Sequence, residues 1–163
     1  MNDAQRPYRA LRAAHRGVAA VEFALVLLFL IPLTVGVVEV GRALYAYDTL
    51  AKSVRSAARY LATVRPNDAA DRQRATCLAV TGSIANSGGT CSGTPLLPGL
   101  TSGMVTILEP STSNEVRLVA TGSGTLDMVT VAISGYPLAT LGSAIFPNLT
   151  LGTISVTVPY VFF

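Results

Sequence analysis

The sequence predicts an α+β fold in which one long N-terminal helix, with its first half in a membrane, carries a small antiparallel β-sheet domain. Two observations predict this fold. In residues 18–40 two glutamates are the only charged residues, and a helical repeat of apolar residues follows. After residue 100 the chain changes to short stretches in which apolar and polar residues alternate. The expected arrangement is a lollipop with the sheet domain at the C-terminal end of the helix.

The apolar run is long enough to cross a membrane. At about 1.5 Å per residue, residues 18–40 reach across most of a hydrocarbon core about 30 Å thick. The whole chain is also apolar for a soluble domain, with 13% charged residues and a mean hydropathy of +0.50. A secretory signal peptide is excluded because its apolar region is about 7–15 residues long and ends at a small-x-small cleavage site, which is missing here. An uncut signal anchor is the simplest interpretation.

Glu22 suggests a role beyond anchoring. A carboxylate at the centre of a bilayer costs about 2.5–3.5 kcal/mol, so such residues tend to be paired and functional. Near a helix end the side chain can instead reach the interface. If the chain is cut after Gly17, Val18 carries a new ammonium group one helical turn from Glu22. Amine and carboxylate could then neutralise each other, most usefully between neighbouring subunits.

Two motifs resemble a known family. Arg16-Gly17 followed by VAAVEFAL resembles the cleavage site of class III signal peptides, which prepilin peptidases cut after the glycine. The stretches GVVEVGRALY at residues 36–45 and AARY at residues 57–60 are similar to TadE-like pseudopilins of tight-adherence (Flp) pilus systems. The resemblance implies that Gly17 precedes the scissile bond, Val18 becomes the N-terminus and Glu22 is the assembly carboxylate. The family motif then comprises Glu39, Gly41, Arg42, Ala58 and Arg59.

This resemblance implies a function in assembly. The chain would be a minor pilin-like subunit of the bacterial inner membrane, with one membrane span and an extracytoplasmic C-terminal domain. Its partners would be the prepilin peptidase, other pilin or pseudopilin subunits, the pilus assembly machinery and membrane lipid. The implied organisation is a cytoplasmic leader (1–17), a transmembrane helix (18–41), its extracytoplasmic continuation (42–65) and a small domain (66–163). The alternatives are an uncut, signal-anchored extracytoplasmic binding protein and a general-secretion pseudopilin.

Charge counts alone do not orient the helix in the membrane. Four basic residues precede the span, and four follow it within twenty residues, so the positive-inside rule gives a tie. The cytoplasmic N-terminus therefore rests on the family resemblance and on the two cysteines.

Beyond the membrane, a seam of apolar residues predicts that the helix continues. Its members recur in alternating steps of four and three: Val40, Leu44, Tyr47, Ala51, Val54, Ala58 and Leu61. The seam should pack on the protein's own domain or on helices of other subunits, and packing within the chain is favoured for its distal half. The helix should end at Arg65 because the residue before a proline is disfavoured in the α conformation.

The two cysteines, Cys77 and Cys91, enclose a loop rich in Gly and Ser. An even count in a segment expected outside the cytoplasm favours one disulfide, and two unpaired buried thiols are the alternative. A zinc site would need further ligands, and the only histidine, His15, lies in the leader. No metal and no other cofactor is predicted.

Four short alternating stretches predict strands, at residues 104–108, 115–121, 128–134 and 153–163. In the third, Val129, Val131 and Ile133 fall on one face, which suits an antiparallel sheet that packs on a helix. Residues 135–150 contain too many Gly and Pro residues to continue the sheet. They are expected to form a long surface loop whose apolar residues are buried beneath it or contact a partner.

Neither an enzyme nor a nucleic-acid-binding protein is predicted. With the only histidine in the leader, a matured chain has no Ser-His or Cys-His pair, and no motif pairs Glu109, Glu115 or Asp127 as acid and base. The net charge of +3 resides in the first seventeen residues, and the remaining residues balance eight basic against eight acidic side chains. That distribution leaves no basic surface for nucleic acid.

Overall fold

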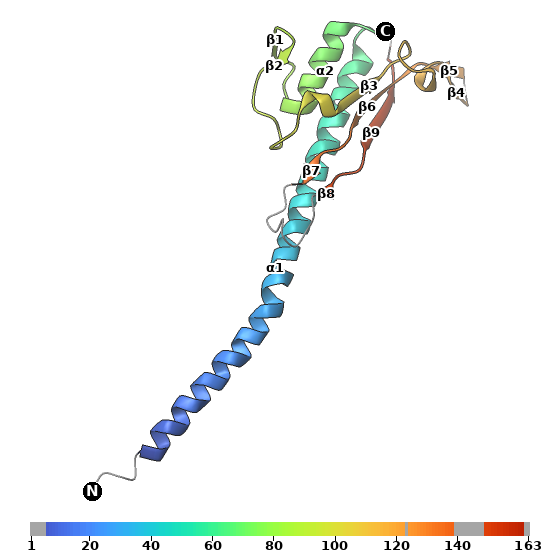
Figure 1. Ribbon diagram of the computed structural model, residues 1–163. Coiled ribbons are helices and arrows are strands. Elements are labelled where there is room, and N and C mark those ends of the chain that lie inside the picture. The colour runs from blue at the N-terminus through green and yellow to red at the C-terminus, as the bar shows by residue number, and fades with distance from the viewer. Residues whose placement is uncertain (1–5, 123, 139–148, 162–163) are drawn as a thin grey trace. The chain divides into compact units, whose positions relative to one another are not determined.

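The computed structural model describes the backbone of residues 6–122, 124–138 and 149–161, and the side chains of these ranges from residue 17 onward (Figure 1). Its fold is α+β, as predicted. The chain divides into two compact units, Met1–Gly41 and Arg42–Phe163. The helices are α1 (Arg6–Thr63) and α2 (Ala69–Thr81), with short 3-10 turns η1 (Ser102–Met104) and η2 (Asn114–Val116). The strands are β1 (Asn86–Ser87), β2 (Thr90–Cys91), β3 (Val105–Leu108), β4 (Val119–Thr121), β5 (Gly124–Leu126), β6 (Met128–Ile133), β7 (Pro137–Leu138), β8 (Leu149–Thr150) and β9 (Ile154–Pro159).

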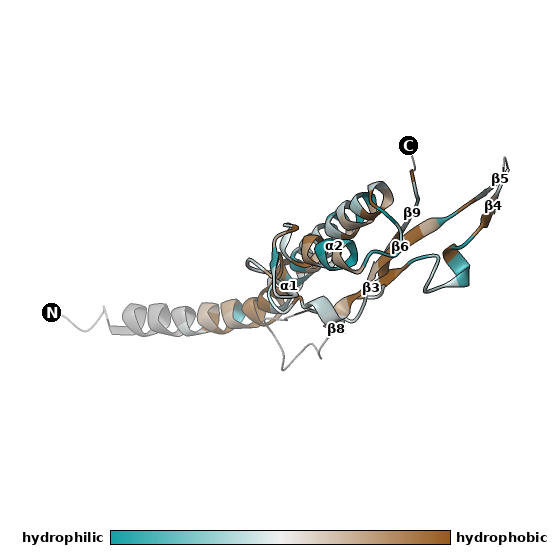
Figure 2. Cartoon of the chain, turned by 90° about the horizontal axis from the view of Figure 1, so that it is seen from above, coloured by the Kyte–Doolittle hydropathy of each residue, from teal (hydrophilic) through white to brown (hydrophobic). Residues whose placement is uncertain are grey.

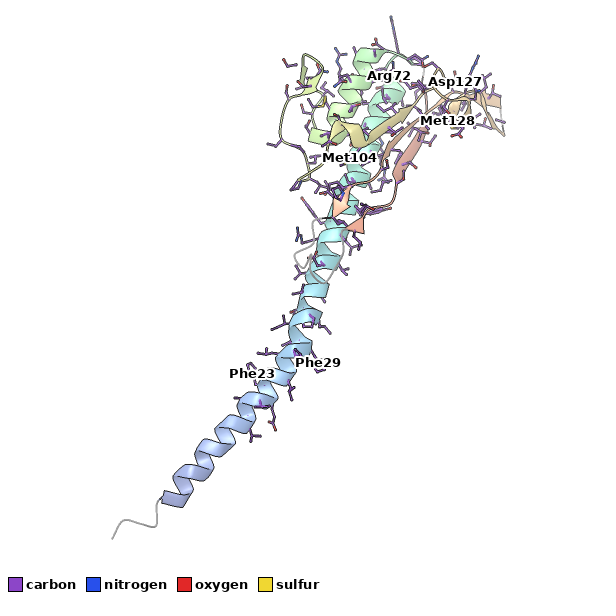
Figure 3. All side chains as sticks on the ribbon, viewed as in Figure 1. Phe23, Phe29, Arg72, Met104, Asp127 and Met128 are labelled. Carbon is purple, nitrogen blue, oxygen red and sulfur yellow. A yellow bond between two sulfur atoms is a disulfide. The ribbon has the colours of Figure 1, made fainter. Side chains whose placement is uncertain are left out.

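The described part of the first unit is a single helical segment, the start of α1. Most of its large apolar side chains are exposed. Phe23 and Phe29 project from the helix and are 63% and 75% exposed (Figure 3). Among the described residues, one helix is long and apolar enough to cross a membrane, and its most apolar window has no buried residue. Packing within the chain therefore does not account for the apolar surface, which fits a membrane anchor.

The second unit is organised around an antiparallel sheet of order β3-β6-β9. The central strand β6 buries every second side chain, and Val129, Val131 and Ile133 are at most 1% exposed, as the alternation predicted. These residues form one buried cluster with Leu50, Val54 and other residues of α1. Figure 2 shows the hydrophobic stretch on β6 and the hydrophilic stretches on α2. One face of the sheet is thus covered by helix.

The predicted helical seam is buried only in its distal half. Val54, Ala58 and Leu61 are at most 1% exposed, whereas Leu44 and Tyr47 are 63% and 52% exposed. At the proximal end the buried positions are instead Ala46 and Leu50. An α-helix turns every 3.6 residues, so a stripe spaced at 3.5 drifts around it by about 20° per heptad. Between Leu61 and Leu44 this drift amounts to about 50°, which shifts the buried stripe from the seam to Ala46 and Leu50.

Helix α2 was not predicted from the sequence, and α1 ends at Thr63, two residues before the predicted end. The local signs of α2 are nevertheless present. The Asp68 side chain caps its N-terminus by accepting a 2.8 Å hydrogen bond from the Ala70 N–H. Gly82 follows its C-terminus with a φ of +74° and donates its N–H to the Leu78 carbonyl. The buried residues of α2 are Asp71, Ala75, Cys77, Ala79 and Val80. Only Val80 among them is a large aliphatic residue, so the sequence shows little apolar periodicity here.

The strand predicted at residues 115–121 is wrong in its first half. Asn114–Val116 forms a 3-10 turn, and Leu118 adopts a left-handed φ of +47°. The Leu118 N–H donates to Oδ1 of Asp127, 2.9 Å away, which holds the chain out of the extended conformation. Of the predicted stretch, Val119–Thr121 forms a strand, and it pairs with β5 in a separate hairpin.

The structure describes two other predicted segments only in part. The predicted loop 135–150 contains β7 and β8, which pair Pro137 with Thr150 and Leu138 with Leu149. Residues 139–148, with most of the predicted partner-contact patch, lie outside the described residues. The last predicted strand, 153–163, is confirmed as β9 over Ile154–Pro159, whereas residues 160–161 do not belong to a strand. Residues 162–163 of that prediction also lie outside the described residues.

Candidate functional site

The predicted cut lies within the continuous helix α1. Gly17 is exposed and Val18 is 58% exposed. A Cβ atom built onto Gly17 would meet no neighbouring heavy atom within 4 Å, and the same holds for Gly36 and Gly41. Packing against the residues that the structure describes therefore does not require glycine at any of the three positions. Glycine lowers helix stability by about 1 kcal/mol relative to alanine, so Gly17 favours local unwinding beside the Gly17–Val18 bond.

Glu22 lies one turn beyond Val18, on the same side of α1 because residues four apart are neighbours on a helix surface. Its side chain is exposed. Among the described side chains, no ion pair includes Glu22. The carboxylate is therefore accessible to a group from another molecule.

The other predicted motif residues are spread along α1 rather than gathered. Gly41 ends the first compact unit and Arg42 begins the second. Ala58 is 0% exposed and belongs to the core cluster, while Arg59 is exposed. The small side chain at position 58 is therefore packed in the core, and Arg59 faces solvent. Ala58 and Arg59 thus occupy different environments, the first in the core and the second on the surface.

The match to known families covers the same helix. Residues 17–59 match the family model described as TadE-like protein. This segment is TadE-like. It begins at Gly17, includes Glu22 and Glu39, and ends at Arg59. No curated protein and no solved structure matches the chain. The TadE-like segment therefore consists of the apolar helix and the part of α1 that enters the core, and the β-sheet lies outside it.

A buried carboxylate in the second unit was missed by the sequence analysis. Glu109 is 1% exposed, and its Oε1 accepts a hydrogen bond from the Tyr160 hydroxyl at 3.3 Å. Its Oε2 lies 3.5 Å from Nε of Arg72, an ion pair that lacks hydrogen-bond geometry. Burial, and then the charge of Glu109, raise the pKa of Tyr160. No sequence motif links these residues, because they come from three separate elements.

A second polar group connects the two helices. Oδ1 of Asp71 accepts hydrogen bonds from the Tyr60 hydroxyl and from Nη1 of Arg74, each at 2.9 Å. Tyr60 lies on α1, whereas Asp71 and Arg74 lie on α2. The group therefore fixes the start of α2 against α1.

The predicted disulfide between Cys77 and Cys91 is confirmed. It joins the buried middle of α2 to strand β2. The β1–β2 turn is formed by Gly88 and Gly89, both with left-handed φ angles, as a tight type I′ hairpin requires. Gln73 donates from Nε2 to the Gly89 carbonyl at 2.6 Å. The loop is thus attached to α2 at two points.

These contacts connect the elements of the second unit to one another. Glu109 is buried and its contacts are with Tyr160 and Arg72 of the same unit. In the described ranges no three His, Cys, Asp or Glu side chains gather as metal ligands would. The surface that remains for function in the TadE-like segment is its exposed helix, with Gly17, Val18 and Glu22 near its start.

Proposed function

We propose that the chain is a minor pilin-like subunit, a pseudopilin of tight-adherence pilus assembly, which a prepilin peptidase cuts after Gly17. The TadE-like match over residues 17–59 carries the proposal. In this proposal residues 18–41 anchor the protein in the bacterial inner membrane, with the N-terminus in the cytoplasm and residues 66–163 outside it. Its partners are the peptidase, other pilin or pseudopilin subunits and the assembly machinery.

The environment of Gly17 supports recognition by a peptidase. Among the described residues no neighbouring heavy atom lies within 4 Å of a Cβ built at that position. A requirement for glycine there would therefore come from a second molecule. An active-site cleft that binds the backbone closely prefers a residue without a Cβ. Glycine also makes the helix easier to unwind around the scissile bond.

The environment of Glu22 supports a role in assembly. Hydrolysis of the Gly17–Val18 peptide bond releases the leader with a new carboxylate and leaves an ammonium group on Val18. The exposed Glu22 carboxylate of one subunit can pair with the Val18 ammonium of a neighbour, and pairing reduces the cost of holding both charges at the edge of the bilayer. The exposed apolar side chains of α1 then exchange contacts with lipid for contacts with neighbouring helices.

The first experiment determines the N-terminal residue and the intact mass of the protein from membranes of its native host, with and without the prepilin peptidase. We expect a start at Val18 when the peptidase is present and at Met1 when it is absent. A start at Met1 in both strains would contradict the proposal and support the uncut, signal-anchored binding protein.

Two glycine variants make the experiment specific. Gly17→Leu should block cutting, whereas Gly36→Leu should leave it intact, although neither glycine has a neighbour within 4 Å of a Cβ. Equal cutting of both variants would contradict recognition of Gly17. Co-purification of the matured protein with tight-adherence pilins, and not with general-secretion pseudopilins, separates the two kinds of assembly.

A further inference from the structure

An open groove of about 310 Å³ lies between α2 and β3 in the second unit. Its helix wall consists of Ala69, Arg72, Gln73 and Thr76, which are spaced to share one face of α2. Its other wall consists of Val105 and Ile107, two residues on the same face of β3. Figure 3 labels Arg72 on this helix.

Strand β3 is an edge of the sheet, and the pattern of its hydrogen bonds shows which backbone groups face outward. Ser134 donates its N–H to the Met104 carbonyl at 3.1 Å, so the pair formed by Met104 and Ser134 is hydrogen-bonded. In an antiparallel ladder bonded and non-bonded pairs alternate. Thr106 therefore bonds to β6, and the backbone groups of Val105 and Ile107 point away from it.

The outward-facing backbone groups of β3 belong to residues that line the groove. The Val105 N–H is used by η1, since it donates to the Ser102 carbonyl. The Val105 carbonyl and both the N–H and the carbonyl of Ile107 remain free of the ladder. Val105 and Ile107 are also the two strand residues that line the groove. The groove thus presents a row of backbone donors and acceptors beside a helix.

Edge strands are commonly protected from further pairing by a charged side chain, a proline or a bulge. Strand β3 has the sequence VTIL, pairs with β6 in continuous register, and has none of these features. The opposite edge strand β9 ends in Pro159. Of the two edges of this sheet, the edge at the groove is therefore the one that lacks a charged side chain, a proline and a bulge.

The charge of the groove favours an acidic occupant. Arg72 is the only charged residue in the lining that the structure describes, and its side chain is 37% exposed. Its partner Glu109 is 1% exposed, so the pair turns its positive end to the groove. Gln73 and Thr76 add polar groups on the same wall.

We infer that the groove between α2 and β3 binds an extended segment of a partner polypeptide, which adds as a strand beside β3 and places an acidic side chain against Arg72. An extended backbone is the chain geometry that satisfies alternating N–H and carbonyl groups along a strand edge. The inference rests on the second unit and does not depend on the proposed role in pilus assembly.

The test uses the full chain in detergent micelles and a fluorescent hexapeptide of sequence TVEVTV. We expect saturable binding and slower hydrogen exchange at the Ile107 amide. The same peptide with N-methyl groups on alternate residues should not bind, because its backbone donors are blocked. A TVKVTV peptide should bind at least about three-fold more weakly, the size of an exposed charge interaction.

Two neighbouring alanines provide matched variants. Ala69 lines the groove and Ala70 does not, and both are exposed in the first turn of α2, where glutamate is well tolerated. Ala69→Glu should weaken TVEVTV binding about three-fold or more, and Ala70→Glu should leave it unchanged. Equal effects of the two variants, equal binding of the methylated peptide, or no saturable binding would overturn the inference. If the protein self-associates and Ala69→Glu abolishes that association, the occupant of the groove is a second copy of this chain, and the inference is overturned.

Discussion

The hydroxyl of Tyr160 donates a 3.3 Å hydrogen bond to Oε1 of Glu109, although 51 positions separate the two residues in the chain. The pair lies in the interior and joins the end of β3 to the end of β9. A buried carboxylate without partners is costly, so the position of Glu109 depends on Tyr160 and on Arg72.

We therefore predict that Glu109→Ala destabilises the second unit. The change leaves the Tyr160 hydroxyl without its acceptor, which costs about 1–3 kcal/mol when the group is buried. Urea unfolding of the full chain in detergent measures the difference. Glu115→Ala is the control, because Glu115 is exposed and its loss should change stability by less than about 0.5 kcal/mol. Equal stability of both variants would show that the contact between Glu109 and Tyr160 contributes nothing to the free energy of unfolding.

Alkaline pH should destabilise the second unit through Tyr160. Burial raises the pKa of this phenol above its ordinary value of 10.0, so the folded state binds the phenolic proton more tightly than the unfolded state does. This contribution to stability is complete below about pH 10 and is lost as the pH rises from there towards the raised pKa. Unfolding measured across this range should show a steeper loss of stability for the wild type than for Tyr160→Phe. Parallel curves would contradict the prediction.

Removal of the disulfide should loosen the loop that joins α2 to β2. The bond closes a loop with a sequence separation of 14 residues, for which the chain-entropy estimate is about 3 kcal/mol. Cys77→Ala together with Cys91→Ala should lower the free energy of unfolding by about that amount. A reducing agent should destabilise the wild type and leave the double variant unchanged. Hydrogen exchange at residues 86–91 measures the loosening directly.

Replacement of two leucines on α1 should have very different effects on the stability of the protein. Leu50 is 0% exposed and Leu44 is 63% exposed. Leu50→Ala should cost about 2–5 kcal/mol of stability through the lost contacts and the cavity. Leu44→Ala should change the stability of the isolated protein by less than about 0.5 kcal/mol. Thermal unfolding of both variants checks this, and a similar loss for both would show that Leu44 is buried in solution.

Under the proposed function, Glu22→Ala should block assembly but not processing. Its carboxylate is exposed on α1, so its loss leaves the fold intact while it removes the partner of a neighbour's Val18 ammonium. The intact mass reports on processing, and electron microscopy with sheared-fibre assays reports on pili. Undiminished pili would remove Glu22 from the assembly mechanism.

Local pattern predicted much of this fold. The long helix, the burial of Val129, Val131 and Ile133, and strands β3, β6 and β9 follow from apolar spacing, because a helix or strand repeats over a few residues. The same reasoning missed α2, because its buried residues include only one large aliphatic side chain, Val80, although the capping residues Asp68 and Gly82 are present in the sequence. It also misjudged residues 115–121, where a hydrogen bond from Leu118 to Asp127 outweighs the strand propensity.

The sequence by itself determined the apolar helix, its glycine and glutamate near the start, and the cysteine pair, since each depends on composition or on neighbours along the chain. Only the tertiary structure decided that Glu109 is buried beneath Arg72, which part of the helical seam faces the core, and that the free edge of β3 lies beside α2. These features arise from contacts between residues far apart in sequence. Such contacts depend on how whole elements pack, and no local repeat encodes that packing.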